Sequence, residues 1–131
     1  MKREDALKLL DDYHRFDDGL LKSFTYSFLR DSSMTVSLEI YARNHAMEGN
    51  VWKTVKLVVT QAGEVRSNFS GGETNVICSG VKLLEFDGKL CLEVDGEYGE
   101  HDPVSMEEVR RISPCFIMGE TIDITELDLD R

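Results

Sequence analysis

The stretch Val76–Val94, VICSGVKLLEFDGKLCLEV, decides the fold. Two runs of strand-forming residues flank Asp87-Gly88, a dipeptide that strongly favours a two-residue turn between antiparallel strands. Counting outward from that turn sets Lys82 opposite Glu93. Such an opposite-charge pair across two strands contributes roughly 0.2–1 kcal/mol. The sequence therefore predicts a hairpin with one defined register.

Alternation of apolar and polar residues predicts further strands on both sides of this hairpin. Before it, strands are expected over residues 22–28, 34–42, 51–60 and 64–70, the last with Val65 and Phe69 facing inward. After it, final strands are expected over residues 115–118 and 121–127, around Gly119. Most connections are short, and short connections demand antiparallel neighbours because a parallel crossover needs a dozen or more residues.

Two helices are expected, one at the N-terminus and one late in the chain. The first, over residues 3–17, has an apolar face at spacings of three and four: Ala6, Leu9, Leu10, Tyr13 and Phe16. Gly19 is expected to end it in the left-handed conformation. Ser105 and Glu108 form a capping-box pattern that predicts a short helix over residues 105–112. Residues 128–131 are expected to form a frayed tail.

These elements predict a single α+β domain over residues 1–131, built on a twisted, mostly antiparallel sheet of six or seven strands. The N-terminal amphipathic helix is expected to cover part of one face. Several strands carry apolar residues on both faces, among them Leu84, Phe86, Trp52 and Val58. The sheet is therefore expected either to curl into a partial barrel or to split into two layers.

The charge balance is the strongest compositional feature. Twenty-five acidic residues against fifteen basic ones leave a net charge of −10. This charge repels nucleic acid phosphates and anionic membrane surfaces, so neither is expected as a partner, and it attracts basic proteins. Acidity that serves only solubility is the alternative interpretation.

Cysteine usage and the absence of export signals predict a cytoplasmic location. Cys78, Cys91 and Cys115 are widely spaced, form no CxxC motif and lie among apolar residues, which predicts buried free thiols in a reducing compartment. No run approaches eighteen consecutive apolar residues, and the N-terminus lacks the apolar core of a signal peptide.

No catalytic or cofactor motif is found in the sequence. It contains no GxSxG, P-loop or HExxH motif, and no GxGxxG that opens a helix after a strand. We therefore expect a protein without enzymatic activity, with no cofactor and no metal site.

The region from residue 85 to residue 108 is rich in acidic side chains that only Lys89 opposes. Its nine acids are Glu85, Asp87, Glu93, Asp95, Glu97, Glu100, Asp102, Glu107 and Glu108. Three interpretations compete: a solvated loop, a calcium site at residues 95–102 whose spacing departs from the EF-hand pattern, and a docking surface for a basic protein. The residues expected to bind such a partner are Asp95, Glu97, Tyr98, Glu100 and Asp102, with Tyr98 as the aromatic anchor.

Four short stretches carry a resemblance to a known group of proteins. They are VSLEI from Val36, WKTVKL from Trp52, SGVKLL from Ser79 and FDGKL from Phe86. In these stretches, which span about residues 34–94, the chain resembles the small acidic immunity proteins that accompany bacterial polymorphic toxins. The resemblance implies an inhibitor that binds and blocks a cognate toxin domain, with no catalytic residue of its own and no particular toxin class.

Two alternative functions remain open at this point. A small-ligand carrier would enclose a pocket in the curled sheet, lined by Phe24, Tyr26, Phe28 and Trp52. A homo-oligomeric structural protein would join its copies through an edge strand. Trp52 fits either the core or an exposed surface.

Overall fold

A computed structural model of the chain describes residues 1–127, and its regular elements follow one another as the alternation predicts. In chain order they are α1 (Arg3–Asp12), the short 3-10 turn η1 (His14–Phe16), β1 (Leu20–Phe28), β2 (Met34–Arg43), β3 (Trp52–Ala62), β4 (Glu64–Ser67), β5 (Val81–Phe86), β6 (Lys89–Val94), α2 (Met106–Ile112), β7 (Cys115–Gly119) and β8 (Thr121–Leu127). The tail expected at residues 128–131 lies outside the described residues.

The central hairpin is confirmed residue by residue. β5 and β6 pair with Lys82 opposite Glu93, and the turn holds Asp87 and Gly88 at φ values of 53° and 78°. Two successive left-handed residues make the turn whose twist suits a two-residue hairpin. β5 begins at Val81 and not at Val76, where the predicted hairpin stretch began. Val76 instead forms an isolated bridge to Leu20 of β1.

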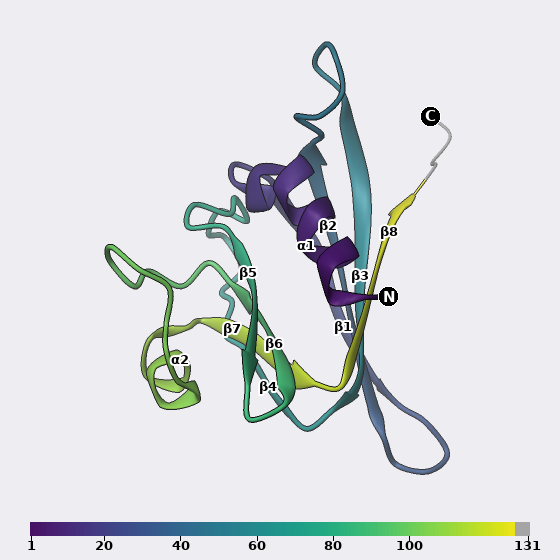
Figure 1. Cartoon of the computed structure of the whole chain (residues 1–131), viewed down its shortest axis with the longest axis vertical. Coiled ribbons are helices and arrows are strands. Elements are labelled where there is room, and N and C mark those ends of the chain that lie inside the picture. Colours follow the sequence, from purple (N-terminus) through teal and green to yellow (C-terminus); the bar gives the residue numbers. More distant parts are fainter. Residues whose placement is uncertain (128–131) are drawn as a thin grey trace.

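The strands form two four-stranded antiparallel sheets rather than a curled barrel. The first sheet has the order β1-β2-β3-β8 and the second the order β4-β7-β6-β5 (Figure 1). The α+β class and the antiparallel pairing are confirmed. Of the two predicted outcomes, the partial barrel is wrong and the split into two layers is confirmed, with eight strands in the described residues instead of six or seven.

One bent ribbon connects the sheets. β3 continues through Gly63 into β4, and β7, which ends at Gly119, continues through Glu120 into β8, so the same antiparallel pair belongs to both sheets. Backbone hydrogen bonds persist through the bend, where Gly63 N–H donates to Met118 O at 2.9 Å and Glu120 N–H donates to Thr60 O at 3.1 Å. Strands that bend from one sheet into another commonly form the corners of two-sheet folds.

The second sheet and α1 lie on the same side of the first sheet, and α2 lies on the outer side of the second sheet (Figure 1). The inner core between the sheets buries Val36, Leu38, Leu57, Leu92 and Ile117 together with Ala6 and Leu10 of α1. A smaller cluster under α2 buries Cys91, Met106, Val109 and Phe116. Both faces of the second sheet are therefore covered, which explains why β5 and β6 are apolar on both sides.

The N-terminal helix is shorter than predicted, although its buried face is the predicted one. α1 ends at Asp12, and His14 to Phe16 adopt left-handed φ values of 50° to 60°. This turn keeps Phe16 fully buried while it redirects the chain into β1. Gly19 does not take the left-handed conformation. It is required because a Cβ there would lie 2.9 Å from Phe16 O and 3.0 Å from Ala42 Cβ.

Three burial predictions need correction or completion. Phe69 is 54% exposed because β4 already ends at Ser67. Cys78 is exposed in the loop before β5, whereas Cys91 and Cys115 are buried free thiols as expected. Trp52 is half-buried on the outer face of the first sheet and packs against Tyr41, with ring centroids 5.4 Å apart.

Among the described residues, no helix is long and apolar enough to cross a membrane.

The bend supplies a matched pair of substitutions. A Cβ at Gly119 would lie 2.4 Å from Val59 Cγ1 and 2.9 Å from Thr60 O, whereas a Cβ at Gly63 would meet nothing within 4 Å. We expect Gly119→Ala to lower the free energy of unfolding by about 1–3 kcal/mol, the usual cost of overpacking. Gly63→Ala should change it by less than about 1 kcal/mol. Urea denaturation of both variants measures the difference, and equal midpoints would show that the ribbon does not require close contact at Gly119.

Candidate functional site

The predicted binding residues lie in the loop between β6 and α2, which we call the acidic loop (residues 95–104). Its first residue has a structural role. Asp95 has a φ of 69°, and its carboxylate accepts hydrogen bonds from Cys78 N–H at 2.8 Å and Ser79 N–H at 2.7 Å. Its own N–H donates to Gly80 O at 2.9 Å. Asp95 therefore ties the acidic loop to the segment before β5.

A buried ion pair supports the loop from beneath. Glu93 is fully buried, and its carboxylate lies 3.8 Å from the Lys82 ammonium, which is also largely buried. The Ser113 hydroxyl, just after α2, donates to Glu93 Oε2 at 2.6 Å. Burial raises the pKa of the Glu93 carboxyl, and the Ser113 hydrogen bond and the Lys82 charge oppose that shift.

Tyr98 covers this ion pair. The Lys82 ammonium lies 5.5 Å from the centre of the Tyr98 ring and donates to Ser79 O at 3.1 Å and to Gly96 O at 3.5 Å. Burial, and then the Glu93 carboxylate, raise the pKa of the Tyr98 hydroxyl. A Cβ at Gly96 would lie 2.2 Å from Glu93 Oε2 and 2.6 Å from Tyr98 Cε2, so glycine allows the loop to close over the pair. Tyr98 is half-buried in this packing.

The other three predicted residues face solvent around a shallow hollow of about 200 Å³. Glu97 accepts a hydrogen bond from the Ser79 hydroxyl at 3.1 Å, and Asp102 lies 3.7 Å from Arg15. Glu100 is exposed beside them. Of these three carboxylates, Asp102 is paired with a guanidinium, and the Lys82 ammonium, which also lines the hollow, is paired with the buried Glu93. Glu97 and Glu100 therefore leave the rim of the hollow negatively charged.

The nine acids of the region separate into two groups in the structure. Three are used within the fold: Glu93 in the ion pair, Asp95 at the backbone amides of residues 78 and 79, and Glu108, which accepts from Val104 N–H at 2.9 Å. The remaining six are exposed: Glu85, Asp87, Glu97, Glu100, Asp102 and Glu107. Sequence alone did not separate these groups, and it did not indicate that Ser113 belongs to the site.

The buried thiols near this region are poor nucleophiles. Burial, and then the Glu93 carboxylate, raise the pKa of Cys91 and of Cys115 to about 12, so both are protonated at neutral pH. Among residues 1–127, no three His, Cys, Asp or Glu side chains are grouped so that they could hold a metal ion. The calcium interpretation therefore gains no support from the described part of the chain.

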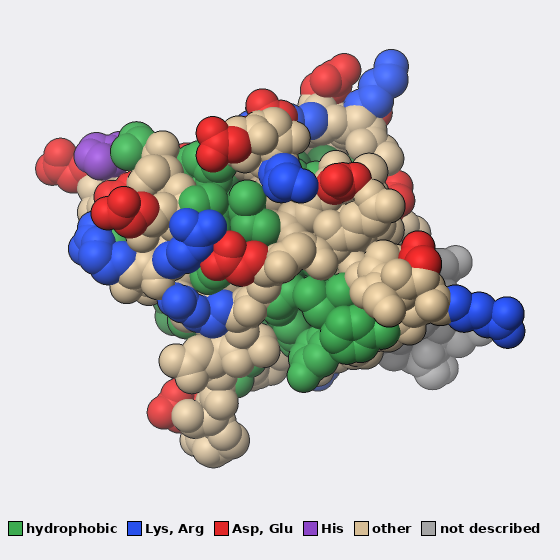
Figure 2. Space-filling view, turned by 90° about the horizontal axis from the view of Figure 1, so that it is seen from below, with side chains coloured by type: hydrophobic (Ala, Val, Ile, Leu, Met, Phe, Trp, Pro, Cys, Tyr) green, Lys and Arg blue, Asp and Glu red, His purple; other side chains and the backbone are tan. Residues whose placement is uncertain are grey.

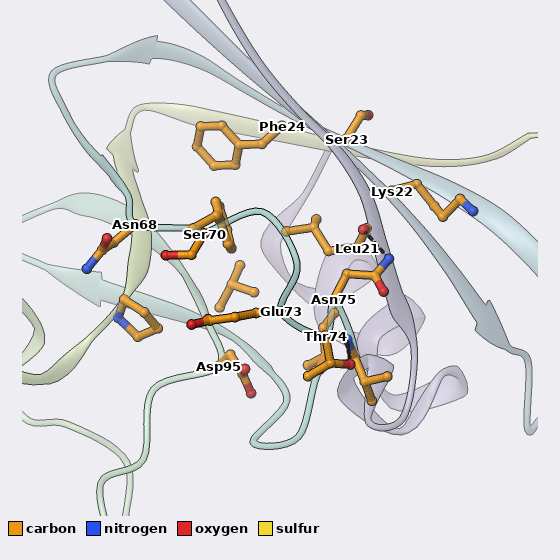
Figure 3. A pocket seen from close by; sticks show the side chains of 15 residues that line it. Leu21, Lys22, Ser23, Phe24, Asn68, Ser70, Glu73, Thr74, Asn75 and Asp95 are labelled. Carbon is orange, nitrogen blue, oxygen red and sulfur yellow. Dashed lines mark hydrogen bonds between the residues drawn. The ribbon is translucent and has the colours of Figure 1, made fainter.

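A second hollow, of about 410 Å³, lies between β1 and the segment from Asn68 to Ile77. Figure 3 shows Leu21 and Phe24 directed into it and Lys22 directed away. Of the aromatic residues expected to line a carrier pocket, only Phe24 lines this hollow among those described; the other three lie elsewhere. Tyr26 and Phe28 are exposed further along β1, and Trp52 lies on the outer face of the first sheet.

No family model, curated protein or solved structure matches this chain. No relative therefore assigns a role to any residue of the acidic loop.

The buried ion pair gives a testable difference in stability. We expect Lys82→Met to lower the free energy of unfolding by about 3–5 kcal/mol, because it leaves the Glu93 carboxylate buried without its counter-charge. Adding Glu93→Gln removes that charge and should recover part of the loss. Lys89→Met is the control, since Lys89 pairs with Glu120 at 3.7 Å on the exposed surface and should cost less than about 1 kcal/mol. Urea denaturation of these variants and of Glu93→Gln alone completes the double-mutant cycle, and strictly additive effects of Lys82→Met and Glu93→Gln would argue against an ion pair.

Proposed function

We propose that this protein is a non-enzymatic binding protein whose acidic loop docks a basic protein domain, in the manner of an immunity protein that blocks a toxin. The observation that carries the proposal is that some charged side chains anchor the loop while others stay exposed on it. Asp95 and the Lys82–Glu93 pair anchor it, while Glu97, Glu100 and Asp102 stay at the surface.

Anchoring matters for recognition because a preorganised surface loses little conformational freedom when a partner binds. The loop is attached at its start by Asp95 and in its middle by Tyr98 over Lys82. At its end, Glu108 accepts a hydrogen bond from Val104 N–H. The exposed carboxylates are thus presented from a backbone that is attached at the start, the middle and the end of the loop.

Charge supports the choice of a basic partner. The chain carries −10 overall, and clustered carboxylates raise the rate of encounter with a positively charged surface. If the partner is a nuclease domain, these carboxylates would occupy the positions of substrate phosphates, and the bound protein would block access to the active site. This mechanism requires no catalytic group on the inhibitor.

The experiment compares two triple variants with the same change in charge. Glu97→Gln/Glu100→Gln/Asp102→Asn neutralises the loop, and Asp17→Asn/Asp18→Asn/Glu48→Gln neutralises three exposed acids elsewhere. Asp95 is left intact in both because it holds the fold. Partners captured from a lysate of the source cells are first identified by mass spectrometry and purified. Association rates are then measured by surface plasmon resonance at low and moderate salt.

We expect the loop variant to associate with the captured basic protein about tenfold more slowly than the wild-type protein, because electrostatic steering is lost. The control variant should remain within about twofold, and raised salt should reduce the difference between the two. Equal association rates for both variants, or a captured partner that is not basic, would contradict the proposal.

A small-ligand carrier remains a second candidate because of the 410 Å³ hollow beside β1. Its lining combines the Phe24 ring with polar groups, including the Glu73 and Asp95 side chains (Figure 3). A ligand there would raise the Tm through binding to the folded state alone. Thermal denaturation with aromatic amino acids, nucleosides and fatty acids tests this candidate. A rise in Tm that persists in Phe24→Ala would place the ligand elsewhere, and no rise with any of them would count against carriage of these three classes.

A further inference from the structure

The open end of β1 carries aromatic side chains that no other part of the described chain covers. Tyr26 is 58% exposed and Phe28 67% exposed, and both lie on the core-facing side of the first sheet. Tyr26 is paired with Val36, which is fully buried one strand away. The β1–β2 hairpin projects beyond the second sheet (Figure 1), and Figure 2 shows hydrophobic side chains gathered on the molecular face seen from below.

The backbone of this edge is also unpaired. Leu29 N–H donates to Ser33 O at 2.9 Å, so the alternation of an antiparallel ladder directs residues 23, 25 and 27 toward β2. The amide and carbonyl groups of Phe24, Tyr26 and Phe28 therefore point outward. At the other end of β1 the edge is already covered, since Leu21 N–H donates to Asn75 O at 2.9 Å.

The three other sheet edges carry features that discourage pairing, and the open part of β1 does not. β8 has Asp123, which pairs with the N-terminal amine at 3.2 Å, and β4 is only four residues long. β5 contains Lys82 and Glu85. Residues 23–29 include no charged residue and no proline. Natural edge strands are usually protected by such charges, by proline or by short length.

We infer that a second copy of this chain covers the edge, with the two β1 strands antiparallel about a two-fold axis at Tyr26. The residues whose backbone groups point outward are symmetric about Tyr26. Phe24 of each copy lies opposite Phe28 of the other, and Tyr26 lies opposite Tyr26 of the other copy. Each of these three residues then forms an aromatic pair across the two strands, a favourable combination. The contact joins two four-stranded sheets into one continuous eight-stranded sheet.

Charge favours a second copy over a basic partner at this edge. Each copy carries −10, so two copies approach most easily through a segment without acids, and residues 19–30 contain none. At each end this register sets Lys22 of one copy opposite Arg30 of the other, with Asp31 next to Arg30 in sequence as a counter-charge. This like-charge pair opposes the contact, and it lies at the ends of the paired segment, where solvent screens it. This edge offers no carboxylate to a basic protein, and it is distinct from the acidic loop proposed above. One strand edge is smaller than a standard interface, so we expect a dimer with a Kd on the order of micromolar.

The oligomeric state is the first test. Sedimentation equilibrium at protein concentrations from micromolar to millimolar should show the mass rising from 14.9 kDa to twice that value. Tyr26→Lys places two ammonium groups face to face at the axis and should weaken the dimer at least tenfold. Thr125→Lys, on the exposed face of β8 at the opposite edge of the same sheet, is the control and should leave the dimer unchanged.

Cross-linking tests the register. In a Cys78→Ser background, which removes the exposed native thiol, Tyr26→Cys sets two Cα atoms about 5.5 Å apart, within disulfide reach. In Phe28→Cys the two introduced cysteines of the dimer lie four residues apart along the paired strands, roughly 14 Å, so this variant is the matched control. Mild oxidation should yield at least tenfold more covalent dimer from Tyr26→Cys. A monomeric mass at all concentrations, a dimer unaffected by Tyr26→Lys, or equal cross-linking by both cysteines would overturn the inference.

Discussion

The bent ribbon that passes from one sheet into the other is the constraint on which the rest of the structure depends. Because β3–β4 and β7–β8 remain paired through the bend, the second sheet lies against the inner face of the first, and the two share one core. Gly119 permits this, since its backbone lies so close to Val59 that no side chain fits. The same bend determines how far the second sheet reaches along the first. The end of β1 extends beyond that cover, and this is why Tyr26 and Phe28 are exposed on a face that is elsewhere buried.

Buried and exposed acidic side chains are stabilised in different ways in this molecule. Inside, an acid is tolerated because specific partners meet it at short range: Ser113 and Lys82 at Glu93, and two backbone amides at Asp95. At the surface, Glu97 and Glu100 are solvated, and their influence on a partner extends over about the Debye length of 8 Å at physiological salt. Neutralising an inner acid would therefore alter stability, whereas neutralising an outer one would alter the rate of association with the proposed basic partner. The acidic loop requires both kinds, because its outer charges keep fixed positions only while the inner ones hold the backbone.

Sequence reasoning succeeded where local chemistry determines the outcome and failed where a distant element determines it. Turn chemistry at Asp87-Gly88 specifies the hairpin register, and the Ser105 side chain caps α2 as predicted, accepting from Glu108 N–H at 3.2 Å. The alternation of β5 and β6 did not reveal that Glu93 would be buried, because its cover comes from other segments, from Gly96 and Tyr98 of the acidic loop and from Ser113. For the same reason Asp95 and Glu97 looked equivalent in sequence. Only the position of the segment before β5 makes one a backbone anchor and leaves the other at the surface.

The two proposed surfaces are compatible because they lie apart in the molecule, with the acidic loop on the far side of the second sheet and the open edge of β1 at the projecting β1–β2 hairpin (Figure 1). A chain with a charge of −10 repels its own copies, and that repulsion is screened over distances longer than the Debye length. The surface where copies meet is therefore expected to be free of acids and remote from the acidic loop. The β1 edge has both properties, so the proposed pairing there would leave the carboxylates of each copy open to the proposed basic partner. Under both proposals, the concentration of acids in one region and their absence from the β1 edge would direct the basic partner and the second copy to separate surfaces.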